Sequence, residues 1–146
     1  MDCEQFSEVD DLLAMVQFGD QKCLHFSQKL HELEIGLGKR RNQINFVMLM
    51  QQLHFLRASM DSTRLALQQW ECKARAYLQQ LHQLVCGRSG LSQEQTIVDH
   101  RDVEQKITSL LRIIKTQHHG LLDKQKRSER LYIVIVEKKQ QLEQLS

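Results

Sequence analysis

Histidine and cysteine are the residues of this chain best suited to bind a transition metal, and the sequence contains 7 of the first and 4 of the second. A metal site needs three or four ligands at one point, and two ligands on one helix meet when they are three or four residues apart. His25 and His31 are six residues apart, and Cys23 precedes His25 with no third ligand nearby. His118 and His119 are adjacent, so they point about 100° apart on a helix. We therefore expect no metal site and no cofactor.

Nucleophilic catalysis is the second chemistry to consider, because Cys86 follows His82 by one helical turn. A reactive thiolate is stabilised at the positive N-terminal end of a helix. Cys86 instead stands directly before Gly87, at the expected C-terminal end of a helix, where its pKa would rise. Gly36-x-Gly38 lacks the preceding strand that a phosphate-binding loop requires. We therefore predict that the chain is not an enzyme and has no catalytic residues.

Two basic clusters are the remaining candidates for binding chemistry, and both would contact an acidic partner. The whole chain has 20 Lys and Arg against 18 Asp and Glu, a net charge of +2, which is too small to indicate a general nucleic-acid-binding protein. An acidic filament or an anionic membrane surface remains open, as does an ordinary solvated helix face. The clusters consist of Lys39, Arg40 and Arg41, and of Lys124, Lys126, Arg127 and Arg130.

The elements that carry these residues are expected to be helices. Proline is absent from the 146 residues and aromatic residues make up only 5%, which favours helix over a β-sandwich or barrel. No apolar run approaches the roughly 18 residues of a membrane span, and the acidic start Met1-Asp2-Cys3-Glu4 is unlike a signal peptide. The cysteines form no C-x-x-C pair, so we expect reduced thiols in the cytosol or nucleus.

An apolar stripe with alternating steps of three and four residues runs from 46 to 84. A second series with the same steps runs from 103 to 145 and is apolar at both ends and polar in its middle. This is the pattern of a coiled-coil seam, and burying such a stripe is what stabilises a long helix. The residues predicted to form the seam against partner helices are Phe46, Leu49, Leu53, Leu56, Met60, Leu67, Trp70, Tyr77, Leu81, Leu84, Val103, Ile107, Leu110, Ile114, Leu131 and Ile135.

Glycine-containing interruptions divide the chain. We predict a short flexible N-terminus over 1–6, helices over 7–36, 43–85 and 93–145, and a loop over 86–92. The first interruption is interpreted as either a tight turn or a kink, with Gly36 or Gly38 in a left-handed conformation and Asn42 as the cap of the next helix. The middle of the last helix is polar, so this part is either exposed or crosses a polar layer that fixes the helix register.

Together these patterns predict an all-α chain: long amphipathic helices in an antiparallel coiled-coil hairpin or a three-helix bundle, completed by partner chains. No motif identifies a family. The proline-free form with Gln-rich flanks resembles small subunits of hetero-oligomeric coiled-coil assemblies such as augmin, kinetochore and vesicle-tethering complexes. The resemblance implies a non-enzymatic structural subunit of the mitotic spindle or cytoskeleton, located in the cytoplasm, at the spindle or centrosome, or in the nucleus. A trafficking-complex subunit and a salt-sensitive module for nucleic acid or acidic membranes stay open as alternatives.

Overall fold

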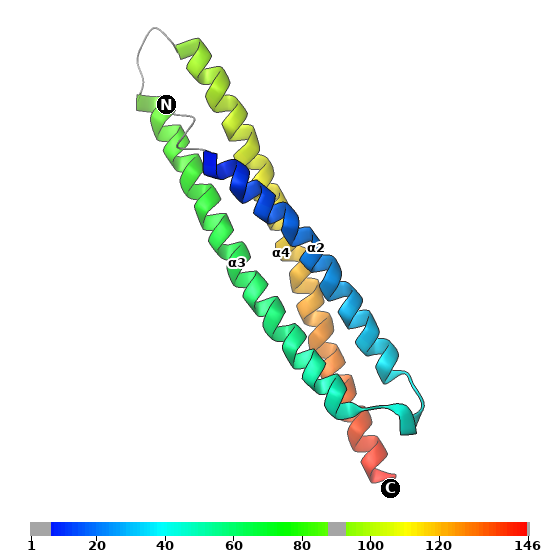
Figure 1. Ribbon diagram of the computed structural model, residues 1–146. Helices are drawn as coiled ribbons and strands as arrows, with labels where there is room; N and C mark the ends of the chain where they lie inside the picture. The colour runs from blue at the N-terminus through cyan, green and yellow to red at the C-terminus, as the bar shows by residue number, and fades with distance from the viewer. Residues whose placement is uncertain (1–6, 88–92, 146) are drawn as a thin grey trace. The chain divides into compact units, whose positions relative to one another are not determined.

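The structure, a computed structural model, describes residues 7–87 and 93–145. It contains three long helices, α2 (Ser7–Leu37), α3 (Phe46–Gly87) and α4 (Gln93–Gln144), and a short 3-10 helix η1 (Arg41–Gln43) (Figure 1). No strand occurs within these ranges, and the prediction of an all-α chain is confirmed. The predicted N-terminus 1–6 and residues 88–92 of the predicted loop lie outside the described residues. Cys86 and Gly87 belong to α3.

The first interruption is a turn between two helices. The backbone N–H of Gly38 donates to the carbonyls of Glu34 and Ile35, at 3.1 Å each, which closes the last turn of α2. None of the described glycines has a positive φ, so the expected left-handed cap is not used. Gly36 has a different role, because a Cβ atom there would lie 3.0 Å from Leu49 Cδ2 on α3. A glycine at this position therefore allows α2 and α3 to approach closely.

Helix α3 begins three residues later than the sequence pattern predicts, because Asn45 rather than Asn42 caps it. The Asn45 Oδ1 atom accepts a hydrogen bond from the backbone N–H of Met48 at 3.1 Å, and the Asn45 carbonyl accepts one from Leu49 at 3.0 Å. This is the geometry of an N-cap, which satisfies backbone donors that have no partner within the helix.

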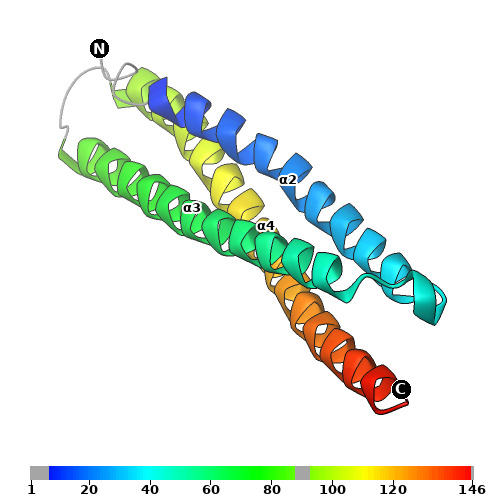
Figure 2. The same ribbon diagram turned by 60° about the horizontal axis from the view of Figure 1, so that its bottom comes forward.

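The described helices belong to two compact units. Unit 1 consists of residues 1–20 and 65–118, and unit 2 consists of residues 21–64 and 119–146. Each unit therefore contains one segment of α2, one of α3 and one of α4. Figure 2 shows the three helices from a second direction. Within each unit the three segments make side-chain contacts with one another, an arrangement compatible with a helical bundle.

Each unit has its own apolar core, built from the predicted stripes and from a matching stripe on α2. Leu67 and Leu110 are fully buried in unit 1, and Leu30, Leu53 and Ile135 are fully buried in unit 2. Burying one such side chain contributes roughly 1.5–3 kcal/mol, so these residues supply much of the free energy of folding.

Helix α4 continues past the end of α2 in unit 2. The Lys138 ammonium donates to the carbonyl of Leu37, the last residue of α2, at 2.7 Å. Residues 139–144 add about 9 Å of helix beyond this contact, and all of them except Leu142 are exposed. Figure 1 shows these last turns in red. This end of α4 therefore has no α2 segment beside it.

Candidate interaction surfaces

The predicted seam lies between the chain's own helices. Eleven of its residues are buried: Leu49, Leu53, Leu56, Met60, Leu67, Leu81, Ile107, Leu110, Ile114, Leu131 and Ile135. The other five are half-buried: Phe46, Trp70, Tyr77, Leu84 and Val103. Any partner of the folded chain therefore has to contact other faces of these helices.

The first basic cluster is open to solvent. Lys39 and Arg40 are exposed in the turn between α2 and α3, and no Asp or Glu forms an ion pair with either of them among the described residues. The side chain of Arg41 lies outside the described part. Two uncompensated positive charges therefore stand at this end of the α2–α3 pair in unit 2.

The second basic cluster, on the segment of α4 in unit 2, is partly used inside the fold. Lys126 and Arg130 are exposed, and Lys124 is half-buried, with its Nζ 3.5 Å from the Gly120 carbonyl. Arg127 donates through Nε and Nη2 to the two carboxylate oxygens of Glu34 on α2, at 2.7 and 2.9 Å. Only Lys126 and Arg130 of this cluster are therefore fully available to a partner.

The bidentate contact with Arg127 lowers the pKa of Glu34. The hydrogen bonds from the guanidinium are the main cause, and its positive charge lowers the pKa further. Because the pKa is lower in the folded chain, the ion pair contributes stability above the ordinary carboxyl pKa of 4.5 and loses it as the pH falls through the folded value. Both side chains are more than a third exposed, so this contribution is modest.

The polar middle of α4 includes a buried layer in unit 1. The Gln117 side chain is buried, and its Nε2 donates to the Val16 carbonyl at 2.6 Å and to Asp20 Oδ1 at 2.8 Å on α2. Its Oε1 is buried without a hydrogen-bond partner. A Cβ atom at Gly19 would lie 2.9 Å from this Oε1. Gly19, which interrupts the apolar stripe of α2, thus provides the space for the Gln117 amide.

A second polar contact in unit 1 joins α3 to α2. The Tyr77 hydroxyl donates to Glu8, and this hydrogen bond, with burial and the nearby negative charge, raises the pKa of Tyr77 to about 12. Since the folded pKa lies above the ordinary value of 10, the contact stabilises the fold fully below pH 10. This stabilisation is lost as the pH rises towards 12.

The residues considered for metal and nucleophilic chemistry are spread over the helices. His25, His31 and His119 are exposed, His118 and Cys23 are half-buried, and the side chain of Cys86 lies outside the described part. His100 is buried, with no hydrogen-bond partner for its Nδ1. Within the described ranges, no three His, Cys, Asp or Glu side chains gather as ligands would.

Charge and exposed apolar surface are distributed unequally between the units. Unit 2 carries 13 Lys and Arg against 7 Asp and Glu, a net charge of +6, whereas unit 1 carries 7 against 11, a net charge of −4. Among the described residues, 13 large apolar side chains are exposed, and 10 of them belong to unit 2: Leu24, Ile35, Val47, Met48, Phe55, Leu122, Tyr132, Ile133, Val134 and Leu145. Unit 2 is therefore the basic unit and, among the side chains that the structure describes, the one with more exposed apolar residues.

The exposed apolar side chains of unit 2 include part of the run 132–136 on α4, which is apolar at every position. Tyr132 is partly covered by α3, where the guanidinium of Arg57 lies 5.6 Å from its ring centre and the His54 ring lies 6.0 Å from it. Ile133 and Val134 remain 52% and 45% exposed. The run thus has apolar surface left over after the chain's own helices have packed.

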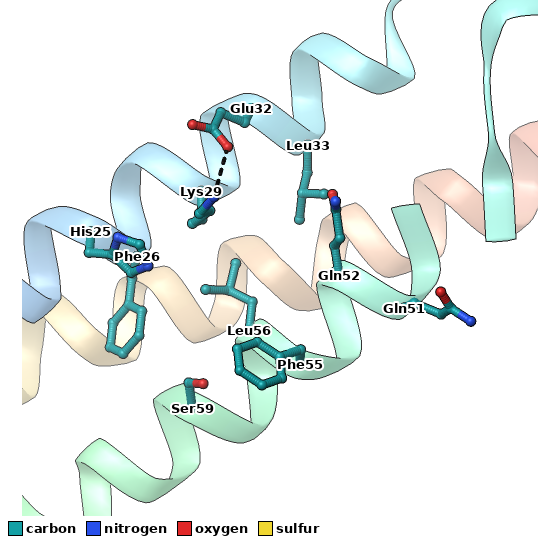
Figure 3. A pocket seen from close by; sticks show the side chains of 10 residues that line it. All are labelled: His25, Phe26, Lys29, Glu32, Leu33, Gln51, Gln52, Phe55, Leu56 and Ser59. Carbon is teal, nitrogen blue, oxygen red and sulfur yellow. Dashed lines mark hydrogen bonds and ion pairs between the residues drawn. The ribbon is translucent and has the colours of Figure 1, made fainter. Parts of the chain in front are cut away.

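An open groove of about 340 Å³ lies between α2 and α3 in unit 2. Figure 3 shows Phe26 and Leu33 of α2 pointing toward α3, and Leu56 of α3 pointing toward α2, with Phe55 next to it. The first three are buried and form an apolar floor, whereas Phe55 is 77% exposed. The groove depends on how two distant segments align, so sequence periodicity alone could not find it, although the exposed Phe55 is recognisable as apolar and off the seam.

No protein-family model, no curated protein and no solved structure matches the chain. In the described residues, none of the helices carries an apolar stretch long enough to cross a bilayer.

Proposed function

We propose that the chain is a non-enzymatic structural subunit of a larger hetero-oligomeric coiled-coil assembly, and that unit 2 carries its contact surface. The observation that supports this most is the concentration of exposed apolar side chains in unit 2, although the apolar stripes of all three helices are already buried there. Scattered apolar side chains are common on protein surfaces, but a local excess marks an interface.

The charge of unit 2 indicates the kind of partner. A surface with a net charge of +6 attracts an acidic protein at long range and disfavours a basic one. The end of α4 beyond α2 adds fewer than two turns of helix, so we place the main contact on the exposed apolar side chains of unit 2. We place the assembly in the cytoplasm, among cytoskeletal or spindle complexes, because the sequence resembles subunits of that kind.

A second candidate function is reversible binding of an anionic membrane or a nucleic acid through unit 2. Its net charge of +6, with Lys39, Arg40, Lys126 and Arg130 all exposed, favours this alternative. Such binding would weaken steeply with salt. A subunit held by apolar contacts would instead remain bound at high salt.

The proposal predicts that Ile133→Asp removes the partner subunits from the chain while leaving the helices intact. A charge on an apolar contact surface has to lose its hydration when the partner binds, which costs several kcal/mol. The measurement is affinity purification of the tagged chain from its own cells, quantified by mass spectrometry, with helix content checked by circular dichroism.

Leu65→Asp is the matched control, because Leu65 is 61% exposed on α3 in unit 1 and the substitution adds the same charge. We expect this variant to retain the partners in unchanged ratio. Equal retention of the partners by Ile133→Asp and wild type, or equal loss by both variants, would contradict the assignment of unit 2 as the contact surface.

A further inference from the structure

The groove between α2 and α3 has the features of a site for one more helix. Its floor is apolar, and the exposed ring of Phe55 lies at its edge. Aromatic side chains of this kind are frequent contact residues in protein interfaces. On α3 the lining extends from Gln51 to Ser59, which is about 12 Å or two helical turns. A partner helix would bury two or three apolar side chains along that length, spaced at three or four residues.

An extended strand fits this site poorly. Both walls of the groove are helices, whose backbone donors and acceptors bond within the helix, so an extended peptide finds no sheet edge to join. The occupant therefore has to bind through side chains, as an amphipathic helix does.

The charges around the groove indicate what the occupant must carry. At the rim, Lys29 and Glu32 of α2 are paired at 3.3 Å and leave no net charge. Lys39 and Arg40 are two charges without an ion-pair partner, and they lie in the turn that joins α2 to α3 and so closes one end of the space between them. Acidic groups at the corresponding end of a bound helix would lie near this turn.

We propose that the groove between α2 and α3 in unit 2 binds an amphipathic helix of a partner subunit, with the apolar stripe of that helix beside Phe55 and its acidic residues at Lys39 and Arg40. This proposal rests on the proposed function and names the chemistry of one partner. The groove is distinct from the exposed run at Ile133 on α4, so the two contacts are separable by mutation.

The test uses the full chain and stapled helical peptides of about 15 residues, followed by fluorescence anisotropy. One peptide carries a leucine stripe with glutamates on its other faces, a second has lysines in place of the glutamates, and a third has alanines in place of the leucines. We expect the acidic leucine peptide to bind wild type at least tenfold more tightly than either of the other two.

Two variants with matched controls locate the binding. Phe55→Ala is expected to lower the affinity of the chain for the acidic peptide at least tenfold. Phe18 is 60% exposed on α2 in unit 1, and Phe18→Ala is expected to leave this affinity unchanged. The double variant Lys39→Glu with Arg40→Glu is expected to lower the affinity for the acidic peptide by a similar factor. The control variant, Lys126→Glu with Arg130→Glu on α4, changes the net charge of unit 2 by the same amount. It is expected to lower the affinity for the acidic peptide much less.

Several results would overturn the groove as a site for an acidic helix. The first is a Phe55→Ala chain that binds the acidic peptide as tightly as wild type does. The second is equal affinity of the wild-type chain for the acidic and the basic peptide. The third is an equal loss of affinity in the two charge-reversal variants. Self-association of the chain that Phe55→Ala abolishes would assign the groove to a second copy instead.

The purification from cells separates this proposal from the proposed function. Partners retained by Phe55→Ala and lost from Ile133→Asp would leave the subunit function in place and remove the groove from it. A chain that binds the peptides with the expected pattern but purifies from its cells alone would contradict the proposed function, while the preference of the groove for an acidic helix would stand.

Discussion

Leu67→Asp is expected to lower the free energy of unfolding by about 4 kcal/mol or more, a large part of the roughly 5–15 kcal/mol that stabilises a typical domain. Leu67 is fully buried on α3, so an aspartate there either loses its hydration as an ion or is forced to bind a proton. The substitution also removes apolar contacts that alone are worth about 2–5 kcal/mol in a Leu→Ala change. The measurement is urea unfolding followed by circular dichroism.

Two neighbouring changes control this experiment. Leu65→Asp adds the same charge two residues away on the same helix, where the side chain is 61% exposed, and should change the free energy of unfolding by less than about 1 kcal/mol. Leu67→Ala should give an intermediate loss. A Leu67→Asp chain with the unfolding midpoint of wild type would show that the core of unit 1 is assigned to the wrong face of α3.

Gly19→Ala is expected to destabilise the chain by about 1 kcal/mol, although alanine favours a helix over glycine by about 1 kcal/mol. The added Cβ would stand 2.9 Å from Gln117 Oε1, so the amide has to shift, and we expect the shift to break its hydrogen bonds to Val16 and Asp20. Each lost hydrogen bond costs about 0.5–1.5 kcal/mol, and the amide nitrogen would then be buried without its partners. Two lost bonds outweigh the gain in helix propensity.

The same substitution should have the opposite effect once Gln117 is replaced by alanine. In a Gln117→Ala chain no amide occupies the space, so Gly19→Ala is expected to stabilise by up to about 1 kcal/mol. The double-mutant cycle then gives a coupling energy of about 2 kcal/mol, measured by urea unfolding of the four chains. A Gly19→Ala effect of the same sign and size in both backgrounds would exclude a polar layer between Gly19 and Gln117.

The spacing of apolar residues predicts most of the fold. The steps of three and four residues that include Leu53, Leu67 and Ile135 identify the buried faces. This works because residues three and four positions apart lie on the same face of a helix. The first helix boundary is less well determined by sequence. Asn42 and Asn45 are both suitable N-caps by residue type. Which of them caps α3 depends on the length of connection that α2 and α3 need in order to pack, and the structure uses Asn45.

The polar and surface features depend on contacts between distant parts of the chain. Gln117 meets Gly19, and Arg127 meets Glu34, at separations of more than 90 residues, and no local pattern pairs them. The charge difference between the units has the same origin. Each unit collects segments from different parts of the sequence, so a whole-chain net charge of +2 conceals +6 in one unit and −4 in the other.

The most direct test of the central claim, that this chain is a subunit of a larger assembly, is the native mass of the particle that contains it when it is isolated from its own cells. The chain alone has a mass of 17.2 kDa. We predict a larger particle with a constant ratio of this chain to other helical proteins, which persists at high salt. A particle that contains a single copy of this chain and no other protein, or only copies of this chain, would contradict the proposed function.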